Sequence, residues 1–291
     1  PTGHRINRLA LPSKDMNRED VRLETSSLGK KRRPIMLQVF SMPVGFLEFD
    51  SKLFFPDDKV GKQITIPVPS YLITHPKGNV VFDTGVHCTC IEDAKGRLGE
   101  VADSFAPRAQ PGEEIVSQLA KFSLTPKDIT YVANSHFHFD HAGGNEFFPT
   151  STFLVQKNEL EASKDPELAE KSFFDPQDYN HPLEYKAIDG EFDIFGDGAL
   201  VLFPTFGHTP GHQSLRIQVA KGTELVVTAD ACYTKRNMDE NMLPSIAYDT
   251  DEMYRSLATL RHMRDRKGST VIYGHDADQW QQMRHAPESL A

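Results

Sequence analysis

Apolar residues occur along most of the chain in short runs that have the length of a β-strand and lie between turn-forming residues. Runs of this kind predict strands. In the first half of the chain, we expect strands at Ile35–Met42, Ile66–Thr74, Val80–Asp83 and Asp128–Asn134. In the second half, we expect them at Thr152–Gln156, Ala199–Pro204, Leu215–Val219, Glu224–Ala229 and Thr270–Tyr273.

Two segments carry apolar residues at helical spacing instead. One is Glu113–Phe122. The other is predicted to begin after Asp249, which forms a capping pair with Glu252, and to run to about Arg266. Because strands and helices recur in both halves, the pattern predicts an α/β fold with two sheets packed together and helices outside.

The N-terminal segment has a different character. Residues 1–34 are polar and charged, with no sustained period, so we expect an arm that lies on the surface or is partly disordered. Residues 35–291 would then form the folded domain. The chain begins at Pro1 without an initiator methionine, which leaves open whether a leader was removed.

Composition and charge exclude several classes of protein. The net charge of −9 repels phosphate backbones, so we expect no nucleic-acid partner. No run reaches the roughly 18 apolar residues that a membrane span needs. Three cysteines cannot form a disulfide framework, which favours a reducing compartment, and we therefore expect a cytoplasmic protein.

The strongest chemical signal is the segment SHFHFDH, which directly follows a predicted strand. It brings together three imidazoles and a carboxylate, from His136, His138, Asp140 and His141. Imidazole nitrogen suits zinc and iron, and a neighbouring carboxylate adds an oxygen ligand that keeps a second divalent ion close. The segment therefore predicts a metal site rather than a set of structural histidines.

Two ions need more ligands than one loop supplies, and three further residues meet this demand. His208, Asp230 and His275 each lie where a predicted strand stops. A rigid sheet holds such residues in a fixed geometry. Their shared placement favours metal binding over a structural role.

This pattern resembles that of a known family. H-x-H-x-D-H followed by His, Asp and His at strand ends is similar to the ligand set of the metallo-β-lactamase superfamily. Within it, the stretches SHFHFDHAGGN, GHTPGHQSL, DACYTK and GHD resemble the N-acyl homoserine lactonases and the γ-butyrolactonases, and the closing run Gly274–Pro287 is most similar to the γ-butyrolactonases. The resemblance covers about Ile35 to the C-terminus and implies an αββα sandwich, in which two mixed β-sheets pack face to face with helices outside.

The resemblance also implies a role for each candidate ligand. One divalent ion would be held by His136, His138 and His208, a second by Asp140, His141 and His275, and both by Asp230. Zinc is the expected metal, although such ligands also accept manganese, iron or cobalt. A hydroxide that bridges the two ions would attack the ester carbonyl of a lactone.

Two residues are expected to act on the substrate. By resemblance, Asp140 would pass a proton to the departing alkoxide, and Tyr233 would hydrogen-bond the substrate carbonyl or leaving oxygen; a core tyrosine is the alternative. Asp83 is expected to accept a hydrogen bond from a ligand imidazole. His212 is expected to be a buried, hydrogen-bonded histidine, because the ligand set is complete without it.

The substrate is predicted less directly. Phe46, Phe49, Phe54, Phe55 and Phe139 would line a channel for an acyl chain, or belong to the core or to a subunit contact, which leaves a homodimer open. We expect a lactonase of the quorum-quenching type that opens N-acyl homoserine lactones. A small γ-lactone hydrolase and a glyoxalase II-like thioesterase are the alternatives that use the same ligands.

Overall fold

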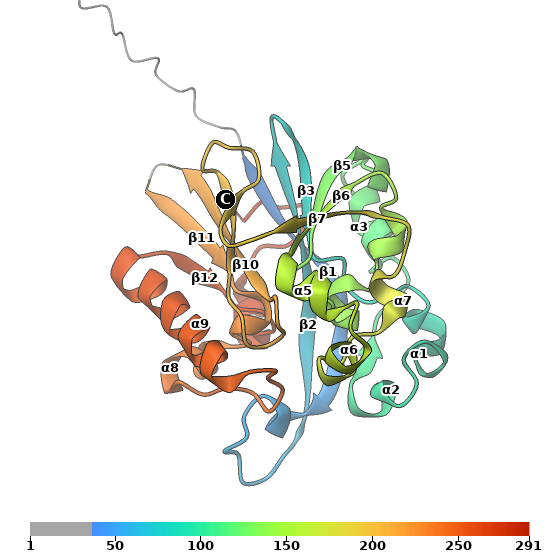
Figure 1. Ribbon diagram of the computed structural model, residues 1–291, viewed down its shortest axis with the longest axis vertical. Coiled ribbons are helices and arrows are strands. Elements are labelled where there is room, and N and C mark those ends of the chain that lie inside the picture. The colour runs from blue at the N-terminus through green and yellow to red at the C-terminus, as the bar shows by residue number, and fades with distance from the viewer. Residues whose placement is uncertain (1–36, 221, 291) are drawn as a thin grey trace, which may run out of the picture. The chain divides into compact units, whose positions relative to one another are not determined.

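A computed structural model describes residues 37–220 and 222–290, which form two β-sheets with helices on their outer faces (Figure 1). The first sheet has the strand order β4-β1-β2-β3-β5-β6-β7, and the second has the order β12-β11-β10-β9-β8. Each sheet contains parallel and antiparallel pairs. This arrangement confirms the predicted αββα sandwich.

The strands of the first sheet are β1 (Gln38–Asp50), β2 (Gln63–His75), β3 (Gly78–Phe82), β4 (Ala106–Arg108), β5 (Ile129–Ala133), β6 (Thr152–Gln156) and β7 (Glu184–Ile188). Those of the second sheet are β8 (Phe192–Asp193), β9 (Leu200–Pro204), β10 (Gln213–Ala220), β11 (Thr223–Val227) and β12 (Thr270–Ile272). The helices are α1 (Cys90–Leu98), α2 (Val101–Ser104), α3 (Ile115–Ala120), α4 (Phe139–Ala142), α5 (Lys157–Ala162), α6 (Pro166–Lys171), α7 (Pro176–Tyr179), α8 (Lys235–Glu240), α9 (Thr250–His262) and α10 (Ala277–Gln282).

The core lies in layers on either side of the first sheet and beyond the second. Successive side chains of a strand point to opposite faces, and β2 is buried on both. Tyr71 and Ile73 pack between the sheets, whereas Val68 and Leu72 pack beneath the helices of the first sheet. A third cluster joins the outer face of the second sheet to α8 and α9. The two sheets are therefore held together by apolar packing, which fixes the relative positions of their strand ends.

Each predicted strand is present, but the predicted end of the first at Met42 is wrong. β1 continues through Pro43 and Gly45 to Asp50. Proline and glycine are typical of turns, which favoured a break at this point. In the structure a bulge between Pro43 and Phe46, with Gly45 at φ = 120°, allows pairing with β2 to resume.

Both predicted helices are present as α3 and α9. The Asp249 side chain accepts a hydrogen bond from the Glu252 N–H at 3.0 Å, as the predicted cap requires. The α-helix ends at His262, and a π-helical turn, Met263–Lys267, continues to the predicted end of the segment. The sequence did not predict the shorter helices or strands β4, β7 and β8. The arm expected at residues 1–34 lies outside the described residues and stays a prediction.

One buried carboxylate ties together two loops that lead out of different sheets. Glu159 on α5 is fully buried and accepts hydrogen bonds from the Phe137 N–H at 3.0 Å and the Gly211 N–H at 2.7 Å. It also accepts one from the Thr209 hydroxyl. Burial raises the pKa of Glu159 to about 7 even though these donors lower it. Gly211 permits the close approach, because a Cβ there would lie 2.2 Å from the Glu159 nitrogen.

Within the described residues, no helix combines the length and apolar character that crossing a membrane would require.

Replacing Glu159 by alanine is expected to destabilise the fold by roughly 3 kcal/mol, because it leaves three buried donors without an acceptor. Urea unfolding monitored by circular dichroism measures the change. The matched control is Glu161→Ala, which removes an exposed carboxylate of the same helix that forms an ion pair with Lys157. Its effect should stay within about 0.5 kcal/mol. Equal effects of the two substitutions would contradict the linking role of Glu159.

Candidate metal centre

Parallel strands of the first sheet deliver four of the predicted ligands, together with Asp83, to one edge of the sheet. β3, β5 and β6 run parallel, so their carboxyl ends lie next to one another. Asp83 follows β3, and His136 and His138 follow β5. α4 begins directly after His138, which places Asp140 and His141 in its first turn. The short helix therefore turns these side chains back toward the strand ends.

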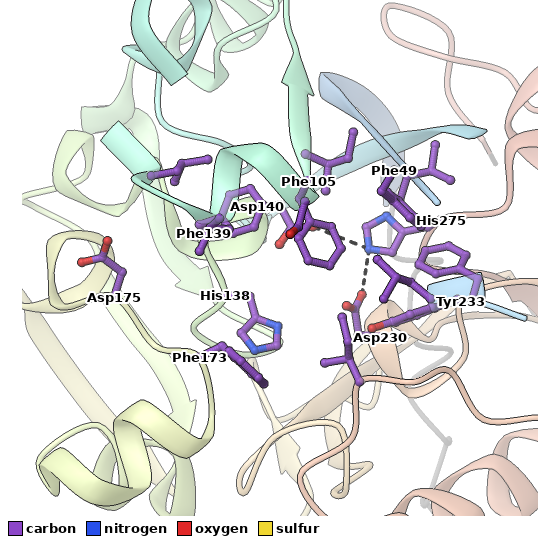
Figure 2. A pocket seen from close by; sticks show the side chains of 18 of the residues that line it. Phe49, Phe105, His138, Phe139, Asp140, Phe173, Asp175, Asp230, Tyr233 and His275 are labelled. Atoms are coloured by element: carbon purple, nitrogen blue, oxygen red, sulfur yellow. Dashed lines mark ion pairs between the residues drawn. The ribbon is translucent and has the colours of Figure 1, made fainter. Parts of the chain in front are cut away.

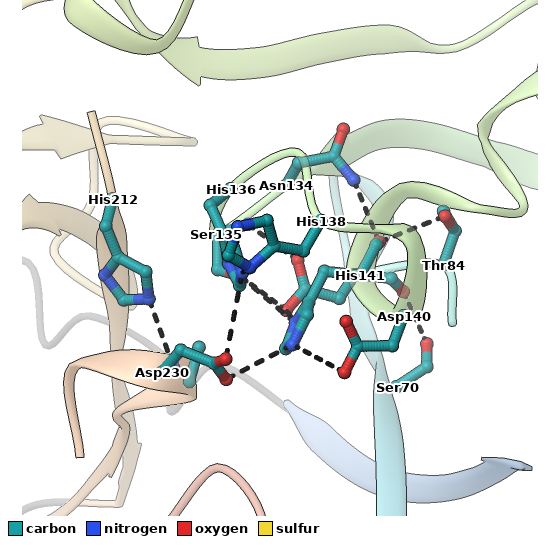
Figure 3. Close-up of polar contacts among 12 residues, drawn as sticks. Ser70, Thr84, Asn134, Ser135, His136, His138, Asp140, His141, His212 and Asp230 are labelled. Atoms are coloured by element: carbon teal, nitrogen blue, oxygen red, sulfur yellow. Dashed lines mark hydrogen bonds and ion pairs between the residues drawn. The ribbon is translucent and has the colours of Figure 1, made fainter. Parts of the chain in front are cut away.

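The second sheet delivers the other three. β10 is antiparallel to both β9 and β11, and β12 is parallel to β11, so β9, β11 and β12 all end at one edge. His208 follows β9, Asp230 lies in the turn after β11, and His275 follows β12. The structure thus brings all seven predicted ligand residues together, and each is buried. Figures 2 and 3 label all of them except His208.

Asp230 lies between two groups of side chains. Its Oδ2 is 3.8 Å from His136 Nε2 and 3.2 Å from His208 Nε2. Its Oδ1 is 3.2 Å from His141 Nε2 and 3.0 Å from His275 Nε2. The first group is His136, His138, His208 and Asp230, and the second is Asp140, His141 and His275; within each, the ligand atoms lie within 4.8 Å of one another. One carboxylate therefore offers one oxygen to each group.

The outward ring nitrogen of each of these five histidines contacts a protein oxygen. The partners are the Ser135 hydroxyl for His136, the Ser172 carbonyl for His138, the Asp83 carboxylate for His141, the Ile246 carbonyl for His208 and the Pro67 carbonyl for His275. The contact predicted for Asp83 is present, at 2.9 Å. Contacts of this kind orient each ring so that its other nitrogen faces the cluster.

His212 lies beside the cluster and belongs to neither group. Its Nε2 accepts a hydrogen bond from the Asp230 N–H at 3.1 Å, and its Nδ1 lies 2.9 Å from the Thr205 hydroxyl oxygen. It is fully buried. The prediction of a buried, hydrogen-bonded histidine is confirmed, and the contact helps to place Asp230.

The cluster has the chemistry of a site for two cations. Nitrogen and carboxylate oxygen donors in this number suit divalent transition metals. His141 Nε2 and Asp230 Oδ1 are buried and have no hydrogen-bond partner among the described residues, although they face each other. Buried polar atoms are costly without a partner, and a cation between them would satisfy both.

The pKa shifts of the clustered side chains also favour the binding of cations. Burial lowers the pKa of His136 well below its usual value, with a further contribution from His141, so its imidazole is neutral and has a free lone pair. Burial raises the pKa of Asp230, but the imidazoles of His141 and His275 outweigh it, and the pKa lies well below its ordinary value. Burial lowers the pKa of His141, yet the surrounding carboxylates raise it well above normal overall. The carboxylates around His141 therefore favour positive charge next to its ring.

A cavity of about 500 Å³ opens onto the cluster, and apolar side chains form most of its wall (Figure 2). Its wall includes the phenylalanines Phe49, Phe54, Phe105, Phe139 and Phe173. Three of these were predicted from the sequence, whereas Phe46 and Phe55, also predicted, do not line it. His138, Asp140 and Asp230 lie in the same wall, so a molecule in the cavity reaches the cluster directly.

Tyr233 lies in the cavity wall next to both groups. Its hydroxyl is 3.4 Å from His208 Nδ1, and its ring packs on Phe54 with the ring centres 4.2 Å apart. Burial raises the pKa of Tyr233 well above its ordinary value, and Asp230 and Asp140 raise it further. The phenol therefore stays protonated at neutral pH and can donate a hydrogen bond.

The sequence reasoning missed Glu159 and Ser172. Glu159 comes three residues after a strand that was predicted correctly, and a carboxylate placed so near a strand end was the available signal. Ser172 acts through its backbone carbonyl, which accepts from His138 at 2.8 Å. Residue type carries no information about such a contact.

Residues 65–275 match the Metallo-beta-lactamase superfamily. The chain is 36% identical over 232 residues to the N-acyl homoserine lactonase AttM of Azorhizobium caulinodans, covering 78% of this chain and 88% of that protein. It is 31% identical to the N-acyl homoserine lactonase AiiA of Bacillus thuringiensis subsp. kurstaki, covering 79% of this chain and 89% of AiiA.

Solved structures show the same relationship. One is an N-acyl homoserine lactone hydrolase with the product N-hexanoyl-L-homoserine bound at its catalytic metal centre; it has a TM-score of 0.77 and 29% identity over 87% of this chain and 98% of that one. Another is a mutant of AiiA from B. thuringiensis with N-decanoyl-L-homoserine bound, with a TM-score of 0.78 and 28% identity over the same shares of the two chains. The chain belongs to the metallo-beta-lactamase superfamily and, within it, to the family of the N-acyl homoserine lactonases.

Proposed function

We propose that this protein is a metal-dependent lactonase that hydrolyses the ester bond of N-acyl homoserine lactones. The observation that carries the proposal is the largely apolar cavity that opens directly onto the seven-residue cluster. A lactone ring can reach the cluster while its acyl chain lies against the phenylalanines. The names of AttM and AiiA, and the product in the similar hydrolase, support the same substrate class.

The proposed ligands divide as the two groups do. One ion is assigned to His136, His138 and His208, the second to Asp140, His141 and His275, and Asp230 is assigned to both. When bound, two divalent cations supply hydroxide from water near neutral pH and offset negative charge that develops on the substrate. We propose zinc, because imidazole nitrogen and carboxylate oxygen are ligands that it prefers.

Two residues of the chain are assigned to the reaction itself. Burial raises the pKa of Asp140, but His141 and His275 lower it more, so its carboxylate is ionised at neutral pH and can accept the proton that the attacking water loses. It lines the cavity, where it can pass that proton to the alkoxide that leaves when the ring opens. Tyr233 donates its phenolic hydrogen to the substrate carbonyl or leaving oxygen.

We also propose a cytoplasmic location. The cysteines Cys88, Cys90 and Cys232 are free thiols, which suits a reducing compartment. The homodimer that the sequence left open stays a prediction.

The function is tested by titrating the protons that the zinc-loaded protein releases from a panel of substrates. The panel contains N-butanoyl, N-hexanoyl and N-decanoyl homoserine lactones, γ-butyrolactone and S-lactoylglutathione. We expect the acyl homoserine lactones to give the highest kcat/KM, because their acyl chains can lie against the apolar wall of the cavity, whereas γ-butyrolactone has no such chain and the glutathione part of the thioester is charged. Cleavage of the thioester alone would reject the lactonase, and a preference for γ-butyrolactone would assign the protein to small lactones.

Replacing Tyr233 by phenylalanine is expected to lower kcat/KM for N-hexanoyl homoserine lactone roughly 10- to 100-fold, because it removes one donor from the reacting oxygen. Metal content and the thermal midpoint should not change. Tyr131→Phe is the matched control, since Tyr131 lies on β5 and does not line the cavity. An unchanged kcat/KM for Tyr233→Phe would remove the proposed role and leave Tyr233 as a core residue.

A further inference from the structure

We infer that Phe173 is a specificity-determining residue, which covers the outer part of the substrate's acyl chain and favours long chains over short ones. The inference rests on the proposed lactonase function and deepens it. Figure 2 shows Phe173 beside His138, on the opposite side of the cavity from Phe49 and His275.

The Phe173 side chain is exposed to solvent. Within the described part of the chain, the exposed large hydrophobic side chains are Val60, Val101, Phe173 and Tyr254. Val101, at 42% exposed, and Phe173, at 71%, line the same cavity. Apolar area left in water is unfavourable, and its concentration around one opening marks a surface that an apolar group covers.

The backbone of Phe173 has an unfavourable conformation for a residue with a side chain. Phe173 has φ = 57°, in the left-handed region that phenylalanine rarely adopts. It directly follows the cap of α6: the Phe173 N–H donates to the Glu170 carbonyl at 3.0 Å, and the Phe174 N–H donates to the Ala169 carbonyl at 2.9 Å. This pair of bonds is the Schellman motif, which strongly favours glycine at the position that Phe173 occupies. A strained and exposed phenylalanine contributes little to folding, so its ring serves another purpose.

Both neighbours of Phe173 in the chain contact His138. The preceding residue, Ser172, accepts the hydrogen bond from His138, and the following ring, Phe174, packs edge-on against the His138 ring with the centres 6.1 Å apart. The segment that carries Phe173 is therefore fixed to the candidate metal centre on both sides. A substrate held at that centre meets the Phe173 ring at a defined position.

The chemistry of the wall identifies what covers the ring. No Lys or Arg is among the described residues that line the cavity, and its charged groups outside the cluster are the carboxylates Glu100 and Asp175. These groups disfavour an anionic tail. Phe49 and Phe54 are only 1% and 3% exposed, so buried side chains such as these enclose a short acyl chain. A longer acyl chain also reaches the exposed side chains of Val101 and Phe173. A neutral alkyl chain of sufficient length fits this wall.

The test compares kcat/KM for N-decanoyl and N-butanoyl homoserine lactone in the zinc-loaded enzyme and in Phe173→Gly. We expect the decanoyl-to-butanoyl ratio to fall about tenfold, equivalent to losing the burial of roughly two methylene groups. The thermal midpoint should stay the same or rise, because glycine relieves the left-handed backbone. Phe173→Leu, which keeps an apolar side chain, should restore much of the ratio.

The matched control is Ser123→Gly. Ser123 has φ = 59° at the end of α3, with the same pair of hydrogen bonds, and it does not line the cavity. Ser123→Gly should keep or raise the thermal midpoint, as expected for Phe173→Gly, without changing the decanoyl-to-butanoyl ratio.

An unchanged decanoyl-to-butanoyl ratio in Phe173→Gly would overturn the inference. A thermal midpoint of Phe173→Gly well below that of the parent would also overturn it, because the ring would then have a structural role. A shift from dimer to monomer in sedimentation with an unchanged ratio would also overturn it and assign the ring to a subunit contact. If the parent enzyme opens none of the acyl homoserine lactones, the proposed function itself fails.

Discussion

The candidate site depends on one buried carboxylate that is shared between two groups of imidazoles. Asp230 directs Oδ2 toward His136 and His208 and Oδ1 toward His141 and His275. An ionised carboxylate in the interior is unfavourable unless positive charge and hydrogen-bond donors surround it. The neighbouring imidazoles supply part of this compensation, and two cations would complete it. The same electrostatic demand that makes an empty site costly would favour the binding of metal cations there.

The packing of the two sheets places both groups of imidazoles around Asp230. β5 and β3 bring residues from one sheet, and β9, β11 and β12 bring residues from the other. Because apolar packing holds the sheets face to face, their strand ends meet with little freedom. Glu159 joins the loops of the two sheets, and Asp83, itself at φ = 60°, accepts from the Ser135 N–H at 2.6 Å and contacts His141. Buried hydrogen bonds of this kind preorganise a site.

Much of this could be predicted from the sequence, because the information is local. The H-x-H-x-D-H segment lies in one loop, and His208, Asp230 and His275 are each marked by the end of an apolar run. The strands themselves are recognisable from their composition, apart from the continuation of β1 past Pro43, where pairing with β2 and β4 overrides the local turn signal.

What could not be predicted depends on contacts between distant segments. The cavity wall combines Phe49 of β1 with Phe105 and Phe173, which are far apart in the chain, and no period links them. Phe55 looked equivalent to Phe54 in the sequence, but it stacks against the Arg236 guanidinium instead of lining the cavity. The left-handed backbone of Phe173 was equally hidden, because residue type alone predicts glycine or asparagine at such a position.

Anomalous diffraction from crystals of the zinc-loaded protein, with elemental analysis of the same sample, is the direct test of the proposed binding of two cations by Asp230. We expect two zinc ions per chain, with a different oxygen of Asp230 roughly 2.0–2.2 Å from each. A single ion or none per chain, or an ion bound away from Asp230, would contradict it.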